Sequence, residues 1–215
     1  GVLDTQTLHP ELQLKFPNIR SYVGQSFDNP GNYIRFSVTN SGFHATITRP
    51  GQSTIYIDPY TSDKSVYMVY ERQNLVNLSV GEFSCETDNS FAEVDKGAYP
   101  SNTLKATDDT TIRVYELALS CTGEYAQVFA GTGDEATQKA NVMSEMVVAM
   151  TRVNGIYEKE MGITYEIIAN NDLIIYLDPD TDPWDDEYND QTQETIDMVI
   201  GDENYDIGHN FNTSG

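Results

Sequence analysis

The 215-residue chain carries 34 acidic and 12 basic residues, which gives a formal net charge of −22 at neutral pH. Such a charge repels the phosphates of nucleic acids and of anionic lipids, so neither class of partner is expected. No window approaches the roughly 18 consecutive apolar residues of a membrane helix. An acidic chain suits hard cations such as calcium, although the charge can equally serve the solubility of a secreted protein.

The first half of the chain has the periodicity of β-strands. The clearest turn signal is Asn40-Ser41-Gly42, and Pro50-Gly51 provides another. Between such turns, apolar and polar residues alternate over 32–39, 43–48, 53–57, 65–70 and 74–83. Short strands at this spacing predict a small antiparallel sheet or sandwich.

A polar stretch over residues 86–109 interrupts this pattern. Gly97, Pro100 and the run 107–110 make it the best linker in the chain. A processing protease could reach an exposed backbone there. The sequence therefore predicts two domains, residues 1–105 and residues 106–215.

The second half alternates strands with helices. A helix is predicted over 134–161, with Asp134 as its N-cap and Gly162 at its end. Its apolar face is formed by Val142, Met146, Met150, Val153, Tyr157 and Met161. Strands are predicted over 111–120, 163–169, 173–177 and 205–211, and a second helix over 191–200. This order predicts a layered α/β domain with a mixed, partly parallel sheet, so the whole chain is expected to be α+β.

Several segments in this order resemble the bacterial reprolysin-type metallopeptidases, which are metzincins. In the second half the segments are 111–125, 150–158, 169–176 and 200–210. Segments 15–22, 42–47 and 56–60 are similar to the prosegment of that family. The resemblance implies an inhibitory, β-rich prosegment over 1–105, followed by the upper subdomain of a zinc endopeptidase over 106–215.

The zinc motif of that family is not found in this sequence. It is a His-Glu-x-x-His-x-x-Gly-x-x-His helix, which places two His on one helical face beside a Glu that acts as general base. The chain contains only His9, His44 and His209, none of them in such a motif. The resemblance therefore implies zinc ligands beyond residue 215, and we expect these residues alone not to hydrolyse peptides.

Two cysteines, Cys85 and Cys121, are present. A prosegment thiolate can occupy the open fourth position of a catalytic zinc, and the resemblance implies this latency role for Cys85. A structural thiol or a disulfide to Cys121 is the alternative. For Cys121 the resemblance implies a disulfide to the remainder of the catalytic domain, with a buried free thiol as the alternative.

The resemblance also identifies Glu116, on the first strand of the catalytic domain, and Asp206 as calcium candidates. Calcium needs several oxygen ligands, so two carboxylates are the start of a site. The family's remaining ligands lie beyond residue 215. Two ordinary surface carboxylates are the alternative.

The acidic stretch 177–190 holds the weaker calcium candidates Asp178, Asp180 and Asp182. Their spacing resembles the opening of an EF-hand loop, but Pro183 stands where glycine is needed and Asn189 where glutamate is needed. An irregular calcium loop and a solvated acidic loop both remain open. Trp184 is expected to anchor this stretch by packing.

The strand histidines His44 and His209 are expected to be hydrogen-bonded structural residues rather than metal ligands. Two functions of different class fit these observations. The first is a secreted, latent precursor of a zinc endopeptidase, whose partners are the rest of its catalytic domain and peptide substrates. The second is a non-catalytic, calcium-stabilised extracellular binding module.

Overall fold

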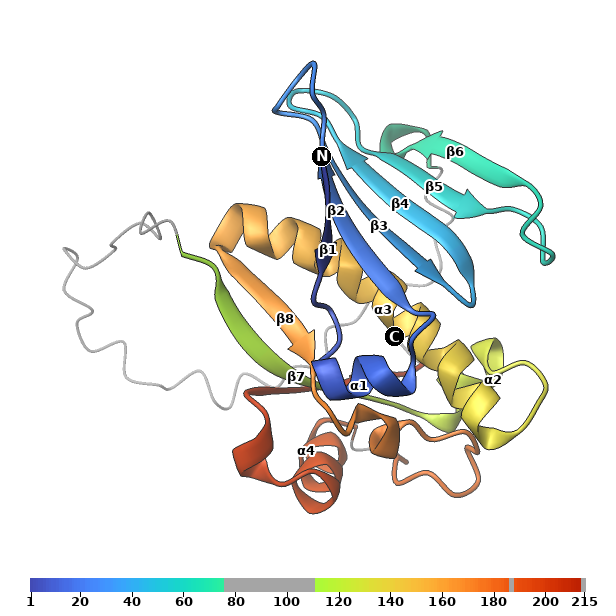
Figure 1. The fold of residues 1–215 in the computed structure, drawn as a ribbon. Coiled ribbons are helices and arrows are strands. Elements are labelled where there is room, and N and C mark those ends of the chain that lie inside the picture. The colour runs from blue at the N-terminus through green and yellow to red at the C-terminus, as the bar shows by residue number, and fades with distance from the viewer. Residues whose placement is uncertain (76–110, 186–187, 214–215) are drawn as a thin grey trace.

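The computed structural model describes residues 1–75, 111–185 and 188–213. Two β-sheets pack against the long helix α3 (Glu135–Met161), as Figure 1 shows. The first sheet is antiparallel and comes from the N-terminal part, and the second is parallel and comes from the part after residue 110. The α+β class is therefore as predicted.

The antiparallel sheet has its strands in chain order, each paired with the next. They are β1 (Val2–Thr5), β2 (Arg20–Gln25), β3 (Tyr33–Thr39), β4 (Gly42–Thr48), β5 (Ile55–Pro59) and β6 (Tyr67–Glu71). The turn predicted at residues 40–42 joins β3 to β4, where Thr39 pairs with Gly42. Gly42 has φ = 111°, a backbone conformation that favours glycine. The strand predicted over 74–83 lies almost entirely outside the described residues, and residues 72–74 form a 3₁₀ turn.

Helix α3 begins and ends where the sequence predicts. The Asp134 carboxylate accepts a hydrogen bond from the N–H of Thr137 at 2.9 Å, which satisfies a free donor of the first turn. Gly162 adopts the left-handed conformation, with φ = 64°, and closes the last turn. Because α3 follows β7 (Arg113–Cys121) and precedes β8 (Ile163–Ile167), it forms the crossover between two parallel strands.

The second sheet differs from the predicted mixed sheet. Its three described strands run parallel in the order β8-β7-β9, where β9 is Ile207–Phe211. Helices α2 (Gly123–Phe129) and α4 (Tyr188–Val199) accompany α3 in the described part of this half, so the prediction of two helices is wrong by one.

The strand predicted over 173–177 is also wrong. Residues Asn171–Ile174 form a 3₁₀ helix, and only Ile175 makes a bridge, to Cys121. The buried Asn171 amide explains the difference: its Oδ1 accepts from the N–H of Leu119 at 2.7 Å, and its Nδ2 donates to the Leu119 carbonyl at 2.8 Å. One side chain thus occupies the place where a neighbouring strand would pair.

Three N-terminal elements were not predicted: β1, β2 and the short helix α1 (Pro10–Lys15). His9 caps α1 by accepting from the N–H of Glu11, and Pro10 stands in the first turn, where its missing N–H costs nothing. The segment before α1 reaches the parallel sheet, where Leu8 bridges Ile167 in parallel.

The larger of two described apolar core clusters joins both halves of the chain. It combines Leu8, Leu12 and Ile19 with Leu119 of β7 and Met146 of α3, all at most 3% exposed. Further buried members are Leu117, Cys121, Ala126, Ala130, Val142, Met143, Val147, Met150, Ile167 and Ile175. Side chains from both sides of the predicted boundary thus share this core cluster, while the boundary near residue 105 lies outside the described residues and the division into two domains stays a prediction.

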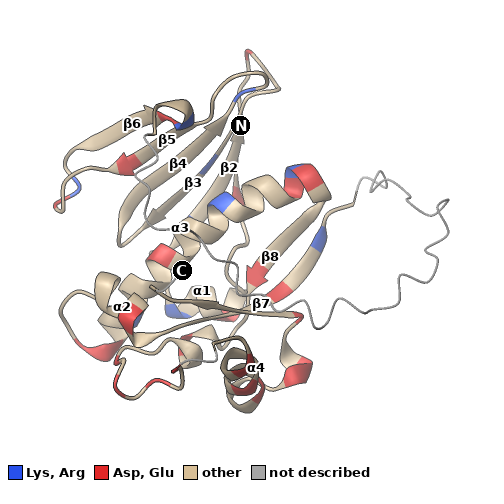
Figure 2. Cartoon of the chain, turned by 180° about the vertical axis from the view of Figure 1, so that it is seen from behind, with Lys and Arg blue, Asp and Glu red and all other residues tan. Residues whose placement is uncertain are grey.

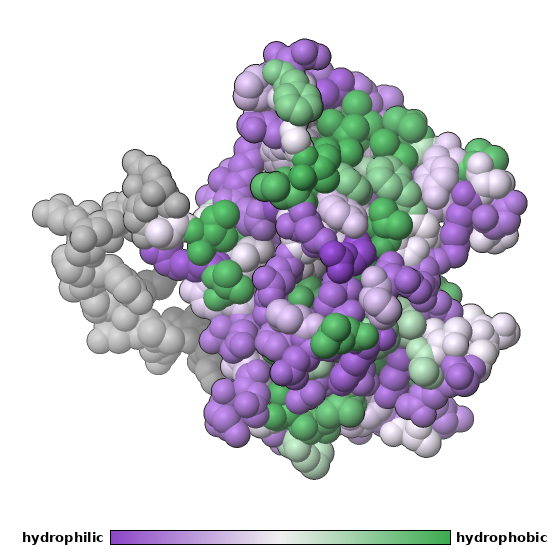
Figure 3. Space-filling view, in the orientation of Figure 1, coloured by the Kyte–Doolittle hydropathy of each residue, from purple (hydrophilic) through white to green (hydrophobic). Residues whose placement is uncertain are grey.

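The antiparallel sheet presents its polar face to α3 and its apolar face outward. Arg35 and Ser37 of β3 are buried, whereas Phe36 between them points to the opposite side, as strand alternation requires. Phe36 stacks with Tyr22 and contacts Phe43 across the strands. Figure 3 shows an apolar patch on this outer side of the sheet. None of the described helices has the length and apolar character needed to cross a membrane.

Candidate functional site

The two main calcium candidates meet in the structure. Glu116 donates its backbone N–H to Asp206 Oδ2 at 2.9 Å, and the N–H of Asp206 donates to the Glu116 carbonyl at 2.9 Å. Asp206 directly precedes β9, which pairs in parallel with β7. Strand pairing thus brings together two residues that are 90 positions apart in the sequence.

These two carboxylates do not by themselves make a metal centre. Within the described ranges, no group of three or more His, Cys, Asp or Glu side chains is placed to hold an ion. Calcium takes about six to eight oxygen ligands, so further oxygens would have to join Glu116 and Asp206. The calcium assignment stays a prediction.

A surface hollow of about 280 Å³ adjoins Glu116 and includes His9. Glu166 of β8 lies opposite Glu116 in the parallel register. Burial raises the pKa of the Glu166 carboxyl, the neighbouring His9 lowers it, and the negative charge of Glu116 raises it. This edge of the sheet therefore accumulates negative charge, which a cation would offset.

A second hollow, of about 310 Å³, lies between α4 and β9. Its lining is neutral and polar: Tyr188, Asn189, Thr192, Gln193, Tyr205, Gly208, His209, Asn210 and Asn212. His209 meets the Phe211 ring edge-on at 5.6 Å, and burial lowers the pKa of its imidazole. None of the described lining residues carries a carboxylate, so these residues offer little to a hard cation.

The acidic loop before α4 is anchored to α2 by Asp182. Its Oδ2 accepts from the N–H of Gly123 at 2.6 Å, and its Oδ1 accepts from the N–H of Trp184 at 3.1 Å. A side chain on Gly123 would collide with the backbone of Pro179, so the loop and α2 are in close contact. Figure 2 shows acidic residues on this loop and on α4. Both carboxylate oxygens of Asp182 thus accept hydrogen bonds that hold the loop in place. Calcium binding by this loop stays a prediction.

Of the other two carboxylates in that loop, Asp178 accepts from the N–H of Asp180 at 3.0 Å. Trp184 packs as predicted: it is 9% exposed, donates its indole N–H to Thr192 at 3.0 Å and meets the Tyr176 ring edge-on.

Cys121 is a fully buried free thiol among the described residues. Its Sγ donates to the carbonyl oxygen of Tyr176 at 3.9 Å. Burial raises the pKa of this thiol to about 12, which disfavours the thiolate that binds metals or attacks disulfides. The disulfide prediction for Cys121 is not tested by this geometry. Cys85 lies outside the described residues, and its latency role stays a prediction.

A polar cluster that the sequence did not reveal surrounds Asp58 of β5. Its Oδ1 lies 2.7 Å from His44 Nδ1 and accepts from Arg152 of α3 at 2.5 Å, while its Oδ2 accepts from the Tyr70 hydroxyl at 2.6 Å. Burial raises the pKa of Asp58, but hydrogen bonds from His44 and Tyr70 and the charge of Arg152 outweigh it and hold the value at about 2. His44 is hydrogen-bonded, as predicted.

Comparison with known protein families gives a match in the second half of the chain. Residues 111–215 match the model of the Metallo-peptidase family M12B, Reprolysin-like. This segment is similar to the reprolysin-like metallopeptidases. Comparisons with curated proteins and with solved structures gave no match. The predicted resemblance is confirmed for the reprolysin-like segment, and the match does not extend to residues 1–110.

The three histidines of the chain do not form a zinc centre within the described residues. Members of the M12B family depend on zinc, but His9 caps α1, His44 lies on β4 and His209 lies on β9. No described group of three potential ligands surrounds any of them. The chemistry of a zinc peptidase therefore cannot be assigned to the residues described in this chain.

Only part of this arrangement has a signal in the sequence. Asp58 precedes Pro59 and marks the end of a strand, but nothing nearby in sequence indicates its partner Arg152. Asn171 looks like an ordinary loop asparagine. Both residues act through contacts that link distant parts of the chain.

Proposed function

We propose that this chain is the prosegment and the first part of the catalytic domain of a secreted, latent zinc endopeptidase of the reprolysin type. The observation that carries this proposal is the family match over residues 111–215. The parallel β7-α3-β8 unit with β9 beside it supports a layered α/β domain in that segment. Zinc would be held by residues outside this chain.

In this proposal residues 1–105 are the inhibitory prosegment. Cys85 supplies the thiolate directed at zinc, which excludes the attacking water and keeps the precursor inactive. Residues 106–215 form the upper subdomain of the cleft and associate with the remainder of the catalytic domain. Peptides or proteins are the substrates of the mature enzyme, and Cys121 forms a disulfide with that remainder.

Calcium binding belongs to the same proposal. The Asp206 carboxylate accepts from the backbone N–H of Glu116, so the two candidate residues are neighbours in the parallel sheet. Their carboxylates and oxygen ligands from the rest of the catalytic domain would together complete the site. Calcium would then stabilise the fold without taking part in peptide hydrolysis.

The direct test uses a longer precursor that includes the sequence downstream of residue 215. We expect about one bound zinc per molecule, little peptidase activity before processing, and about a tenfold or greater rise in the uncut Cys85→Ala variant. Ser84→Ala is the matched control and should stay latent. A precursor without zinc and without peptidase activity after processing would contradict the proposal.

The same material tests the binding-module alternative, which the meeting of Glu116 with Asp206 favours. That alternative predicts a calcium-dependent rise in melting temperature, lost in Asp206→Asn, with neither zinc nor peptidase activity. Calcium stabilisation together with zinc-dependent activity would instead support the precursor.

A further inference from the structure

The N-terminal part of the chain supplies core residues to the reprolysin-like part. Leu8, Leu12 and Ile19 are 3%, 0% and 1% exposed, and they pack in one cluster with Leu119 and Met146. Separating the two parts would return these side chains to water, which opposes dissociation because apolar surface is driven out of contact with water.

The same N-terminal segment extends the parallel sheet. The N–H of His9 donates to the carbonyl oxygen of Ile167 at 2.8 Å, and the N–H of Ile167 donates to the Thr7 carbonyl oxygen at 2.8 Å. Thr7 is itself buried, and its hydroxyl hydrogen-bonds to Ser21 of β2. Residues 7–9 thus cover the edge of β8 that does not face β7.

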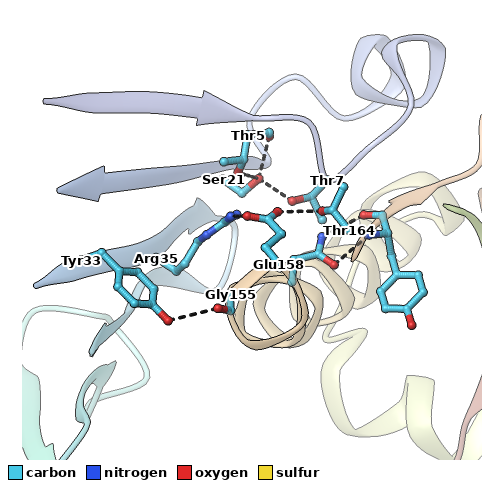
Figure 4. Close-up of polar contacts among 10 residues, drawn as sticks. Thr5, Thr7, Ser21, Tyr33, Arg35, Gly155, Glu158 and Thr164 are labelled. Atoms are coloured by element: carbon cyan, nitrogen blue, oxygen red, sulfur yellow. Dashed lines mark hydrogen bonds and ion pairs between the residues drawn. The ribbon is translucent and has the colours of Figure 1, made fainter. Parts of the chain in front are cut away.

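A buried ion pair joins the antiparallel sheet to α3, as Figure 4 shows. Arg35 of β3 is 6% exposed and pairs with Glu158 of α3. Glu158 also accepts a hydrogen bond from the Thr164 hydroxyl of β8 at 2.8 Å. One carboxylate therefore links β3, α3 and β8, and dissociation would leave two charged groups without partners.

Gly155 allows this sheet to approach α3 closely. A Cβ at this position would lie 2.9 Å from Arg35 Cγ, which is too close for carbon atoms. The Tyr33 hydroxyl donates to the Gly155 carbonyl oxygen at 3.1 Å (Figure 4). Glycine is unfavourable inside a helix, so its presence within the C-terminal third of α3 is explained by contact with the sheet.

From these contacts we infer that residues 1–75 stay bound to the reprolysin-like part as a non-covalent subunit after the chain is cut between them. A processing protease would hydrolyse one peptide bond with water in the predicted linker 86–109, yet the shared core and the Arg35–Glu158 pair would remain. Activation then proceeds by nicking, and the N-terminal sheet remains part of the processed protein. The role of this cut in activation rests on the proposed function.

The test places a recognition sequence for a site-specific protease within residues 86–109 of the full chain. After complete cutting, native mass spectrometry and size-exclusion chromatography at low micromolar concentration should show both fragments in one complex. They should separate only when denaturant also unfolds α3, as followed by circular dichroism. Fragments that separate on dilution, while the part after residue 110 keeps its helical signal, would overturn the inference.

Three variants locate the interaction, each checked for helical content before cutting. Arg35→Met leaves Glu158 unpaired, and Gly155→Ala favours the helix itself while obstructing Arg35; each should weaken the complex by about tenfold or more. Arg20→Met is the matched control, because Arg20 lies on β2 and pairs with the exposed Asp4 of the same sheet. Its complex should be unchanged within about twofold. Equal effects of Arg35→Met and Arg20→Met would contradict the assigned interface.

The longer precursor separates this inference from the proposed function. Retained fragments with zinc-dependent peptidase activity support both. Retained fragments without zinc or activity support retention alone and contradict the proposed function. Peptidase activity that appears only after the N-terminal fragment has separated supports the proposed function and contradicts activation by nicking, whereas fragments that separate on cutting overturn retention.

Discussion

The two sheets contact helix α3 through opposite kinds of side chain. The parallel sheet presents Leu119 and Ile167, both fully buried, whereas the antiparallel sheet presents Arg35 and the Asp58 cluster. Apolar contacts are non-directional and tolerate small shifts, but buried charges need particular partners at particular distances. The contacts of the parallel sheet with α3 therefore supply stability that depends little on pH. The contacts of the antiparallel sheet with α3 depend on charge and on exact pairing.

The largest loss of stability is expected where the N-terminal part packs into the apolar core that it shares with the parallel sheet. Leu12→Ala should lower the free energy of unfolding by about 3 kcal/mol, because the leucine is fully buried in the common core. Leu14→Ala on the same helix is the control, since Leu14 is 81% exposed, and it should change little. Urea denaturation measures both. A small effect of Leu12→Ala would mean that α1 is not part of the cooperative core.

The next largest effect is expected at Asn171, a buried polar side chain beside strand β7 of the parallel sheet. Asn171→Leu removes the amide that satisfies both the N–H and the carbonyl of Leu119. Buried backbone groups without partners cost about 1–3 kcal/mol, so we expect a loss of about 2 kcal/mol in urea denaturation. Asp172→Asn, at an exposed pair with Lys15, is the control next to it in sequence. An unchanged stability of Asn171→Leu would show that water or a shifted backbone replaces the amide.

The sequence predicts the periodic elements well and the contacts between them poorly. Alternation identifies β3 and β4, and apolar spacing with Asp134 and Gly162 defines α3. The strand β2 is missed because its residues do not alternate clearly and it depends on pairing with β1 and β3.

Alternation also leaves open which face of a strand meets the helix. In β3 the buried side is that of Arg35 and Ser37, and Phe36 faces outward. The choice depends on Glu158, more than a hundred residues later in the chain. For the candidate site, the meeting of Glu116 with Asp206 follows from parallel pairing, whereas the Asp58 cluster depends on the docking of a whole sheet onto α3.

The antiparallel side should respond to acid through Asp58. Its folded-state pKa of about 2 lies below the ordinary value of 3.8, so its contribution is fully present above pH 3.8 and is lost as the pH falls toward 2. The shift corresponds to about 2 kcal/mol over this window. Urea denaturation between pH 5 and pH 2 should show a shallower pH dependence in Asp58→Asn than in the unsubstituted chain. Equal slopes would mean that other carboxyl groups carry the acid response.

The smallest effect is expected at an ion pair that touches neither α3 nor the parallel sheet. Arg20 and Asp4 pair across β2 and β1, with side chains 42% and 46% exposed. Exposed pairs contribute about 0–1 kcal/mol because water and salt screen them, so Arg20→Met should change the free energy of unfolding by no more than about 0.5 kcal/mol. Urea denaturation at low and high salt measures this. A loss as large as that of Arg35→Met would mean that charge pairing within the antiparallel sheet, rather than burial against α3, determines how that sheet is held.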